Sequence, residues 1–582
     1  MKEILGCLKP YRRQVIVAIL LMMLDVFCEV IQPTLMADII GERGIGAGNI
    51  PYILKIGALM IAVAIVGLIA GCSNAGVSAK AGMGFSANLR EKLFTKVQTF
   101  SFRNIDRFST ASLSTRLTND ITQLQNVVTM GMRMMIRAPL MLPFALIMAI
   151  GINAQLALIL GVAIPVLLVL LVLLVWRALP LFRKMQQSVD YLNRTVQENV
   201  TNMRVVKSFV RETREKEKFE QASARQMKAS MDAMYAIVLN MPLMMFVMNA
   251  TIVAVVFFGG RQIVFGTLTV AEMSKFINYI MQILFSLMMF AMMFMVLSRA
   301  SASYQRIREV LDTQPDLESA PQAVSAKNLR GHIAFHDVSF RYNTEDSGEP
   351  VLSHINLTIE PGQMTAIIGG TGAGKTSLIS LIPRLYDVTE GAILLDGRDV
   401  RDYRLETLHE EISVVLQNNT LFSGTIADNL RWGDPNATEH DLVRAAKAAQ
   451  AHEFISSFPK GYDTWIEQGG VNVSGGQKQR LCIARALLRH PKILILDDST
   501  SAVDTATEQR LRAAFREQLA DTTILLIAQR ISSVRDADQI IVMDDGQIVG
   551  KGTHEDLLAS CTAYQEIYQS QQKEEDSACP AL

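Results

Sequence analysis

The stretch "MTAIIGGTGAGKTSL", residues 364–378, decides the fold of the C-terminal half of the chain. An apolar run typical of a buried strand leads directly into the pattern G-x-x-x-x-G-K-[ST], from Gly369 to Thr376. In this pattern backbone N–H groups close around phosphates, Lys375 reaches the β- and γ-phosphates, and the Thr376 hydroxyl holds Mg²⁺. The stretch therefore predicts a nucleotide site formed by Gly369, Gly370, Thr371, Gly372, Ala373, Gly374, Lys375, Thr376 and Ser377.

A second motif lies about 120 residues further on, in "ILILDDSTSAVD", residues 493–504, where an apolar strand ends in two acids. Asp497 ends this strand and supplies the carboxylate that a P-loop nucleotidase places behind its Mg²⁺. The next residue in such sequences is usually Glu, which activates a water. Here it is Asp498, one methylene shorter. We therefore expect Asp498 to act as a weakened base.

Between these motifs lies "VSGGQKQR", residues 473–480. Ser474 is placed to cap a helix, and Gly475 and Gly476 leave its first amides open to an anion, followed by Gln477. A second phosphate-binding element in one domain is unusual for a monomer. It is explained if this loop contacts nucleotide held by another subunit.

The N-terminal half has a different character. Half of all residues are hydrophobic, and six segments carry the roughly 20 apolar residues that a membrane span needs. These segments are 14–40, 53–79, 127–152, 155–178, 236–260 and 274–299. The two long connections are rich in Lys and Arg, which places both termini in the cytoplasm. The zero net charge gives no indication of a nucleic-acid partner.

The domain organisation follows from this change in composition. We expect a transmembrane domain at 1–310, a linker at 311–330, an α/β nucleotide-binding domain at 331–570 and a disordered tail at 571–582.

Two features of the spans bear on cargo. Asp25 and Glu29 share one face of the first span, where they either contact cationic or polar substrates or form a structural pair. Methionines cluster in "MPLMMFVMN", 241–249, and "LMMFAMMFM", 287–295. Such flexible side chains adapt to varied apolar ligands, so Met288 and Met292 are candidate substrate contacts.

Taken together, these motifs resemble an ATP-binding cassette (ABC) exporter half-transporter over nearly the whole chain. The resemblance implies an all-α, six-helix transmembrane domain of the type IV exporter fold, followed by an α/β P-loop domain that uses ATP and Mg²⁺. It implies that Tyr342 stacks on adenine, that Gln417 touches Mg²⁺ and the membrane domain, and that residues 473–477 form the signature loop. It also implies a D-loop at 501–504 and coupling helices near 104–112 and 203–211.

The sequence departs from the family pattern where hydrolysis takes place. Asp498 replaces the catalytic Glu, and Gln529, in "LIAQR", replaces the switch His. The signature loop is intact. The resemblance therefore implies a heterodimeric, multidrug-type exporter in a bacterial plasma membrane. This chain would be the subunit whose own ATP site is degenerate, that is, impaired in hydrolysis. A homologous half-transporter would be its partner, and its cargo would be amphipathic and drug-like.

Other functions stay open. A protein of this fold can import metal–chelate complexes, or export peptides or lipids. A third possibility is a nucleotide-gated channel or regulatory sensor. The direction of transport in inverted vesicles separates import from export, and single-channel currents would support the channel.

Overall fold

The computed structural model describes residues 2–327, 329–342, 350–499 and 503–578. Side chains at a few helical positions, including Met288 and residues 290–299, fall outside the description. The chain divides into two compact units. The N-terminal unit comprises Met1–Gln98 and Thr110–Thr313, and the C-terminal unit comprises Thr99–Ser109 and Gln314–Leu582.

Helices joined by short turns make up the N-terminal unit, and no strand occurs among its described residues. Its elements are α1 (Lys2–Gly6), η1 (Lys9–Tyr11), α2 (Arg12–Ile40), α3 (Ile50–Gln98), α5 (Thr110–Thr115), η2 (Arg116–Asp120), α6 (Ile121–Met130), η3 (Gly131–Met135), α7 (Ile136–Ile152), α8 (Ala154–Thr201), α9 (Met203–Ser208), α10 (Glu212–Val238), α11 (Asn240–Val264) and α12 (Val270–Asp312).

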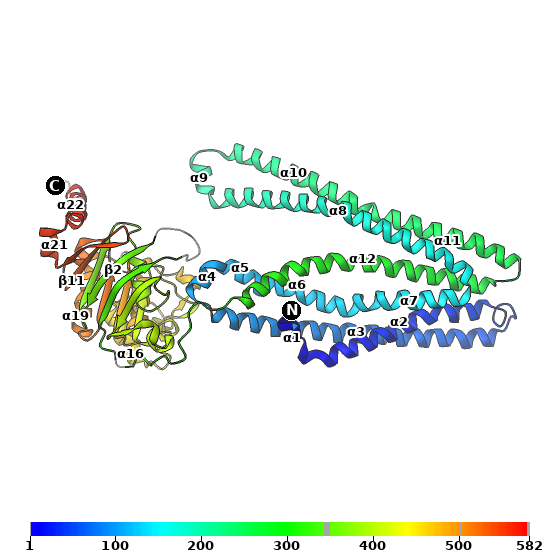
Figure 1. The fold of residues 1–582 in the computed structure, drawn as a ribbon, viewed down its shortest axis with the longest axis horizontal. Helices are drawn as coiled ribbons and strands as arrows, with labels where there is room; N and C mark the ends of the chain where they lie inside the picture. The colour runs from blue at the N-terminus through cyan, green and yellow to red at the C-terminus, as the bar shows by residue number, and fades with distance from the viewer. Residues whose placement is uncertain (1, 328, 343–349, 500–502, 579–582) are drawn as a thin grey trace. The chain divides into compact units, whose positions relative to one another are not determined.

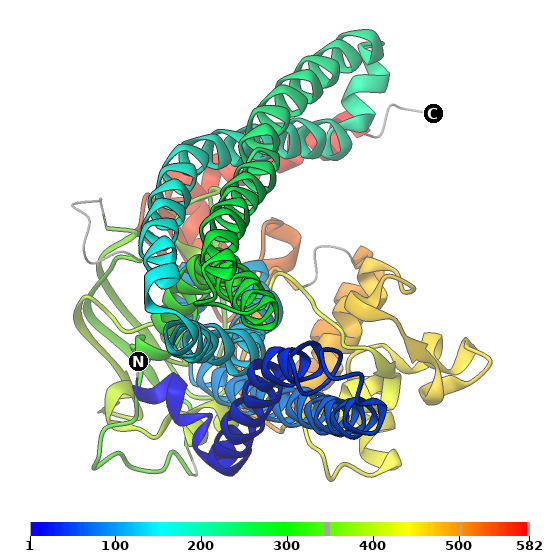
Figure 2. The ribbon, with the colours of Figure 1, turned by 90° about the vertical axis from the view of Figure 1, so that its right-hand side faces the viewer.

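Several of these helices are longer than a bilayer requires. α3 has 49 residues and α8 has 48, which at a rise of 1.5 Å per residue is about 70 Å, against a hydrocarbon core of about 30 Å. α8 and α10 diverge from α12 toward the α9 end (Figure 1), and Figure 2 shows the same divergence from the end. These helices are therefore long enough to continue well beyond a membrane span.

The prediction of six spans is not confirmed by count. In the described part of the chain, five helical segments are long and apolar enough to cross a membrane: Lys9–Ile40, Ile50–Gln98, Thr110–Ile152, Ala154–Thr201 and Glu212–Val264. The sixth expected span, 274–299, falls within α12. Many of its side chains lie outside the described residues.

The C-terminal unit combines two main sheets with flanking helices. The strands are β1 (Ile333–Phe340), β2 (Leu352–Ile359), β3 (Met364–Gly369), β4 (Glu390–Leu395), β5 (Arg398–Asp399), β6 (Ile412–Val415), β7 (Gly424–Thr425), β8 (Trp465–Ile466), β9 (Ile493–Asp497), β10 (Thr523–Ile527), β11 (Gln539–Asp544) and β12 (Gln547–Gly552). The helices are α4 (Phe102–Phe108), α13 (Lys375–Leu381), α14 (Leu405–Glu411), α15 (Ile426–Arg431), α16 (Glu439–Ala448), α17 (His452–Ser457), α18 (Gly475–Leu487), α19 (Thr505–Gln518), α20 (Ile531–Val534), α21 (His554–Ser560) and α22 (Thr562–Ala578).

The six-stranded sheet positions the site. Its order is β12-β11-β3-β10-β9-β6, and every neighbouring pair is parallel except the edge pair β11–β12. β3, β9 and β10 are buried along nearly their whole length, which explains their continuous apolar sequences. Parallel strands place their carboxyl ends on one edge, where ligands bind in open α/β sheets. Gly369, Asp497 and the residues after Ile527 therefore meet at that edge.

Candidate nucleotide site

The loop after β3 has the backbone conformation that a phosphate cradle requires. Gly372 and Gly374 have φ values of 86° and 88°, in the left-handed region that glycine adopts without penalty. A Cβ on Gly374 would lie 2.8 Å from a Leu352 methyl carbon. No larger side chain fits at Gly374 without rearrangement, so the loop stays narrow and its amides stay accessible.

Lys375 lies at the start of α13 and folds back over this loop. Its Nζ donates to the carbonyl oxygens of Gly369 at 2.9 Å and Gly370 at 2.7 Å. Burial lowers the pKa of Lys375, while Asp497 and Asp498 oppose that shift. The ammonium is thus held at the loop by carbonyl contacts, which a phosphate would replace with an ionic contact.

The two acids at the end of β9 have different partners. Asp497 Oδ1 accepts a hydrogen bond from the Thr376 hydroxyl at 3.2 Å. Asp498 Oδ2 accepts one from Gln529 Nε2 at 2.8 Å. The structure therefore brings together the two positions at which this sequence departs from the exporter pattern that it resembles, and a hydrogen bond joins them directly.

Both carboxylates are buried, and burial is the main cause of their shifted pKa values. It raises the pKa of Asp497, and Asp498 raises it further against the opposing effects of Thr376 and Lys375. Burial also raises the pKa of Asp498, while hydrogen bonds from Gln529 and Gln417 and the charge of Lys375 act in the opposite direction. Hydrogen bonds donated by side-chain amides therefore help to stabilise the ionised form of Asp498 in this buried site.

These residues line one cleft of about 560 Å³. Of the residues expected from the sequence, Gly369, Gly370, Thr371, Gly372, Lys375, Thr376, Gln417, Asp497, Asp498 and Gln529 line it. Ala373, Gly374 and Ser377 shape the loop but do not line the cleft. The predicted P-loop and acidic strand thus form a single site.

The C-terminal helix α22 contributes residues that the sequence analysis missed. Glu566, Ile567, Ser570 and Gln571 line the same cleft. Gln571 Nε2 donates to the Gln529 carbonyl at 2.7 Å, and the Ile531 N–H donates to Gln571 Oε1 at 2.7 Å.

The helix also changes the expectation for the tail. Residues 571–578, expected to be disordered, continue α22. The helix forms because Tyr564 is fully buried, with Ile567 and Tyr568 packed against the core. Spacings of three and four residues between these side chains are the signal that could have revealed it.

Gln571 is expected to restrain the switch segment that carries Gln529. Gln571→Ala leaves one N–H and one carbonyl of this segment without their partners, at a cost of about 1–3 kcal/mol. We expect amide hydrogen exchange across residues 527–534 to accelerate about tenfold or more. Gln572→Ala is the matched control, because Gln572 donates to Tyr568 instead. Equal exchange in the two variants would contradict this role.

The signature residues lie apart from this cleft. Ser474 Oγ accepts from the Gln477 N–H at 3.3 Å, and the Ser474 N–H donates to Gln477 Oε1 at 2.9 Å. This reciprocal cap starts α18, as the sequence predicts. Ser474 and Gly475 are exposed, and none of residues 474–477 lines the cleft.

Tyr342 also lies outside the cleft. Its hydroxyl is 2.9 Å from Ser377 Oγ, and its ring meets Tyr386 edge-on at a centroid distance of 5.1 Å. It borders a smaller cavity of about 130 Å³ that includes Arg103 and Tyr386. Stacking of Tyr342 on adenine therefore stays a prediction. Residues 501 and 502 of the expected D-loop lie outside the described residues.

The substrate-contact candidates in the N-terminal unit are two acids and two methionine clusters. Arg137 forms an ion pair with Asp25, at 3.7 Å, and another with Glu29. The geometry therefore favours the structural-pair interpretation of the two acids. In the first methionine cluster Met244 is buried, while Met241 and Met245 are exposed. The side chains of Met288 and Met292 lie outside the described residues.

Two short helices lie at or near the positions where the sequence predicts coupling helices. α9 (Met203–Ser208) lies within the segment expected near 203–211, and α4 (Phe102–Phe108) overlaps the one expected near 104–112 but begins two residues earlier. α4 belongs to the C-terminal unit, where the Tyr386 hydroxyl donates to Asp106 Oδ2 at 2.8 Å. Burial and this carboxylate both raise the pKa of Tyr386. The phenol therefore stays protonated and donates to Asp106.

A P-loop unit joined in one chain to membrane-length helices defines an ATP-driven membrane transporter. Residues 15–288 match the family model described as "ABC transporter transmembrane region", and residues 352–501 match the one described as "ABC transporter". The chain is 39% identical over 571 residues to the uncharacterized ABC transporter ATP-binding protein YfiB of Bacillus subtilis, covering 98% of each. The chain belongs to the ABC transporter family.

Two further comparisons describe the type of transporter. A fatty acid ABC transporter ATP-binding/permease protein of Mycobacterium bovis is 36% identical over 479 residues, which cover 82% of this chain and 75% of that protein. A solved structure of a bacterial Atm1-family ABC exporter with ATP bound superposes with a TM-score of 0.81 and 25% identity, covering 96% of this chain and 98% of that chain. The protein is thus a multi-pass membrane ATPase with an exporter fold, which couples ATP binding to transport.

Proposed function

We propose that this chain is the slowly hydrolysing subunit of a heterodimeric exporter for amphipathic cargo. The observation that carries the proposal is the contact between Asp498 and Gln529. A catalytic Glu would extend one methylene further toward the attacking water, and a switch His could carry positive charge. Asp498 is shorter and already accepts a hydrogen bond, and the Gln529 amide stays neutral.

The remaining parts of the site are suited to holding nucleotide. The glycine cradle and Lys375 would contact the phosphates. Mg²⁺ prefers oxygen ligands. The Thr376 hydroxyl and the Gln417 amide oxygen would bind it directly, and the Asp497 carboxylate would lie behind these direct ligands. Bound Mg²⁺ would neutralise phosphate charge. ATP would then be retained here while the cassettes stay in contact.

The exposed signature loop supports a partner subunit. The N-terminus of α18 presents capped but accessible amides, and such an end attracts phosphate. Because residues 474–477 do not line their own chain's cleft, we assign them to the Walker site of a homologous half-transporter. That partner is expected to carry the catalytic Glu and the switch His.

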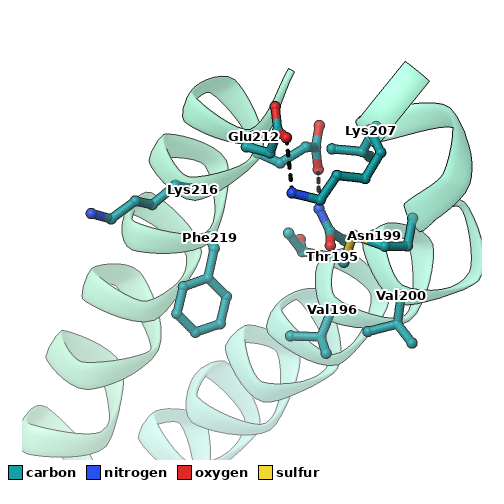
Figure 3. Close-up of a pocket in the computed structure, with 11 residues that line it drawn as sticks. Thr195, Val196, Asn199, Val200, Lys207, Glu212, Lys216 and Phe219 are labelled. Carbon is teal, nitrogen blue, oxygen red and sulfur yellow. Dashed lines mark hydrogen bonds and ion pairs between the residues drawn. The ribbon is translucent and has the colours of Figure 1, made fainter. Parts of the chain in front are cut away.

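The tip of the second cytoplasmic loop supports the same conclusion. A pocket of about 420 Å³ lies between α8 and α10. In Figure 3 the side chains of Val196, Val200 and Phe219 line it below the ion pair of Lys207 and Glu212. Nearby, Phe209 is 72% exposed and Val210 is 79% exposed. An apolar tip of this kind indicates an interaction surface, and we assign it to contact with the partner's cassette.

The proposal is tested by purifying the chain alone and together with a candidate partner half-transporter, then measuring ATPase activity. We expect the pair to hydrolyse ATP and the chain alone to bind ATP with little turnover. Turnover of tens per second by the chain alone would overturn the proposal. Transport in inverted vesicles from a bacterial plasma membrane tests export against import of metal chelates.

Coupling is expected to depend on the bond between Tyr386 and α4. Tyr386→Phe removes the hydrogen bond to Asp106 and keeps the ring. We expect basal ATPase activity of the pair to persist, with stimulation by cargo reduced several-fold. Tyr403→Phe is the control, because the Tyr403 hydroxyl donates to the Leu395 carbonyl and not to α4. An equal loss of stimulation in both variants would contradict the assignment.

A further inference from the structure

A cavity of about 570 Å³ lies within the N-terminal unit, among α2, α3, η3, α7 and α12. Its charged lining residues are Asp25, Arg133 and Arg137. On α3, Gly67 and Gly71 face Asp25, and a Cβ on Gly71 would lie 3.6 Å from Asp25 Oδ1. The small residues of α3 thus leave room beside the charges.

The charge available in this cavity is positive. Arg137 is held by Asp25 and by Glu29, and Glu29 is not among the lining residues. Arg137 is therefore neutralised within the protein, and Arg133 is the cationic lining residue that these two ion pairs do not involve. Arg133 is exposed and forms no ion pair among the described residues. Its guanidinium offers five N–H donors in a fork that fits carboxylate or phosphate oxygens.

The backbone around Arg133 is irregular. Residues Gly131–Met135 form η3, a π-helical turn within the α6–α7 segment. Pro139 follows in α7, and proline supplies no N–H for the carbonyl four residues earlier, that of Met135. The hydrogen-bond ladder is therefore interrupted where η3 ends. Single π-helical turns occur often at functional sites.

The rest of the lining and the position of Arg133 indicate an acyl chain. Met22, Leu68, Met134 and Met289 add apolar, mostly flexible surface. Arg133 precedes the end of α7 at Ile152 by 19 positions, about 28 Å along a helix, which is close to the thickness of the hydrocarbon core. If the termini are cytoplasmic, as the sequence predicts, Arg133 would lie near the headgroups of the inner leaflet, where basic pockets bind anionic lipids.

We infer that this cavity binds an amphiphile with one anionic headgroup, carboxylate or phosphate, at Arg133, and with its acyl chain along the methionine-lined wall. The inference rests on the proposed function, because it names the cargo class of the exporter. It favours the structural-pair alternative for Asp25 and Glu29 over the alternative in which they contact cationic or polar substrates. In this arrangement both acids fix Arg137, and Arg133 selects the headgroup.

The test uses the assembled pair in lipid nanodiscs and a palmitate that carries a photoreactive diazirine. Saturable labelling of this chain is measured by mass spectrometry, with palmitate, hexadecyl phosphate, hexadecanol and hexadecyltrimethylammonium as competitors. We expect the two anions to compete, their ratio showing which headgroup is preferred. The neutral and cationic compounds should be at least tenfold weaker. Arg133→Gln should raise the half-saturating concentration at least tenfold.

Two variants make the result specific. Arg133→Lys keeps the charge and should retain most labelling, while Arg177→Gln removes an exposed arginine of α8 that does not line the cavity. Non-saturable labelling, equal competition by the cationic compound, or equal effects of Arg133→Gln and Arg177→Gln would overturn the inference. Labelling does not require hydrolysis. If saturable labelling is absent but ATPase activity still requires both subunits, the cargo inference is wrong and the proposed function still holds.

Discussion

The double substitution Asp498→Glu and Gln529→His is expected to raise ATP turnover at this chain's own Walker site by about 10²-fold. Glu restores the missing methylene at the end of β9, and His restores a group that can become cationic near the γ-phosphate. Positioned general-base catalysis contributes roughly 10²–10⁴-fold. In the present structure Gln529 Nε2 binds Asp498 Oδ2 at 2.8 Å, so the two positions act as a unit.

The measurement is single-turnover hydrolysis in the pair, with the partner's catalytic Glu replaced by Gln so that only this site can act. Each single substitution is expected to recover much less than the double one, because cooperating catalytic groups are not additive. Asp498→Asn with Gln529→His controls for the loss of the base. If the double variant binds ATP normally but hydrolyses it no faster, Asp498 and Gln529 are not the cause of slow turnover.

The second large effect is expected in the signature loop. Gly476→Asp places a carboxylate in the first turn of α18, where the open amides and helix dipole favour an external phosphate. We expect steady-state ATPase activity of the pair to fall at least 10²-fold. ATP labelling at this chain's own P-loop should be unchanged, because Gly476 does not line that cleft.

Val473→Leu is the matched control for this variant. It adds one methylene and no charge at the position just before the Ser474 cap, and we expect activity to be unchanged or slightly higher. Loss of ATP labelling on this chain together with loss of activity would show that Gly476 serves its own site. That outcome would contradict the assignment of the loop to a partner.

The local structure of the candidate nucleotide site and of the signature loop was largely predictable because its signals are local. The glycines around Lys375, the Ser474 cap and the apolar strand ending at Asp497 each depend on a few consecutive residues. Backbone geometry and capping chemistry determine such positions directly. The structure then brings the residues after β3, β9 and β10 to one sheet edge, as parallel pairing requires.

The features that sequence reasoning missed depend on contacts between distant segments. Gln571 meets Gln529 from 42 positions away, and Arg137 meets Glu29 across 108 positions. No local pattern distinguishes an acid that faces a substrate from one that faces an arginine on another helix. The polarity of residues 570–582 likewise hid α22, because the side chains that hold the helix, such as Tyr564, precede the polar run.

The most direct test of the central claim is the steady-state ATPase activity of the pair after the partner's catalytic Glu is replaced by Gln, with this chain unchanged. The account predicts a loss of at least about 10²-fold, with ATP still bound at this chain's P-loop, because Asp498 cannot sustain turnover. Retention of half the activity would show that Asp498 is an adequate base and would contradict the account.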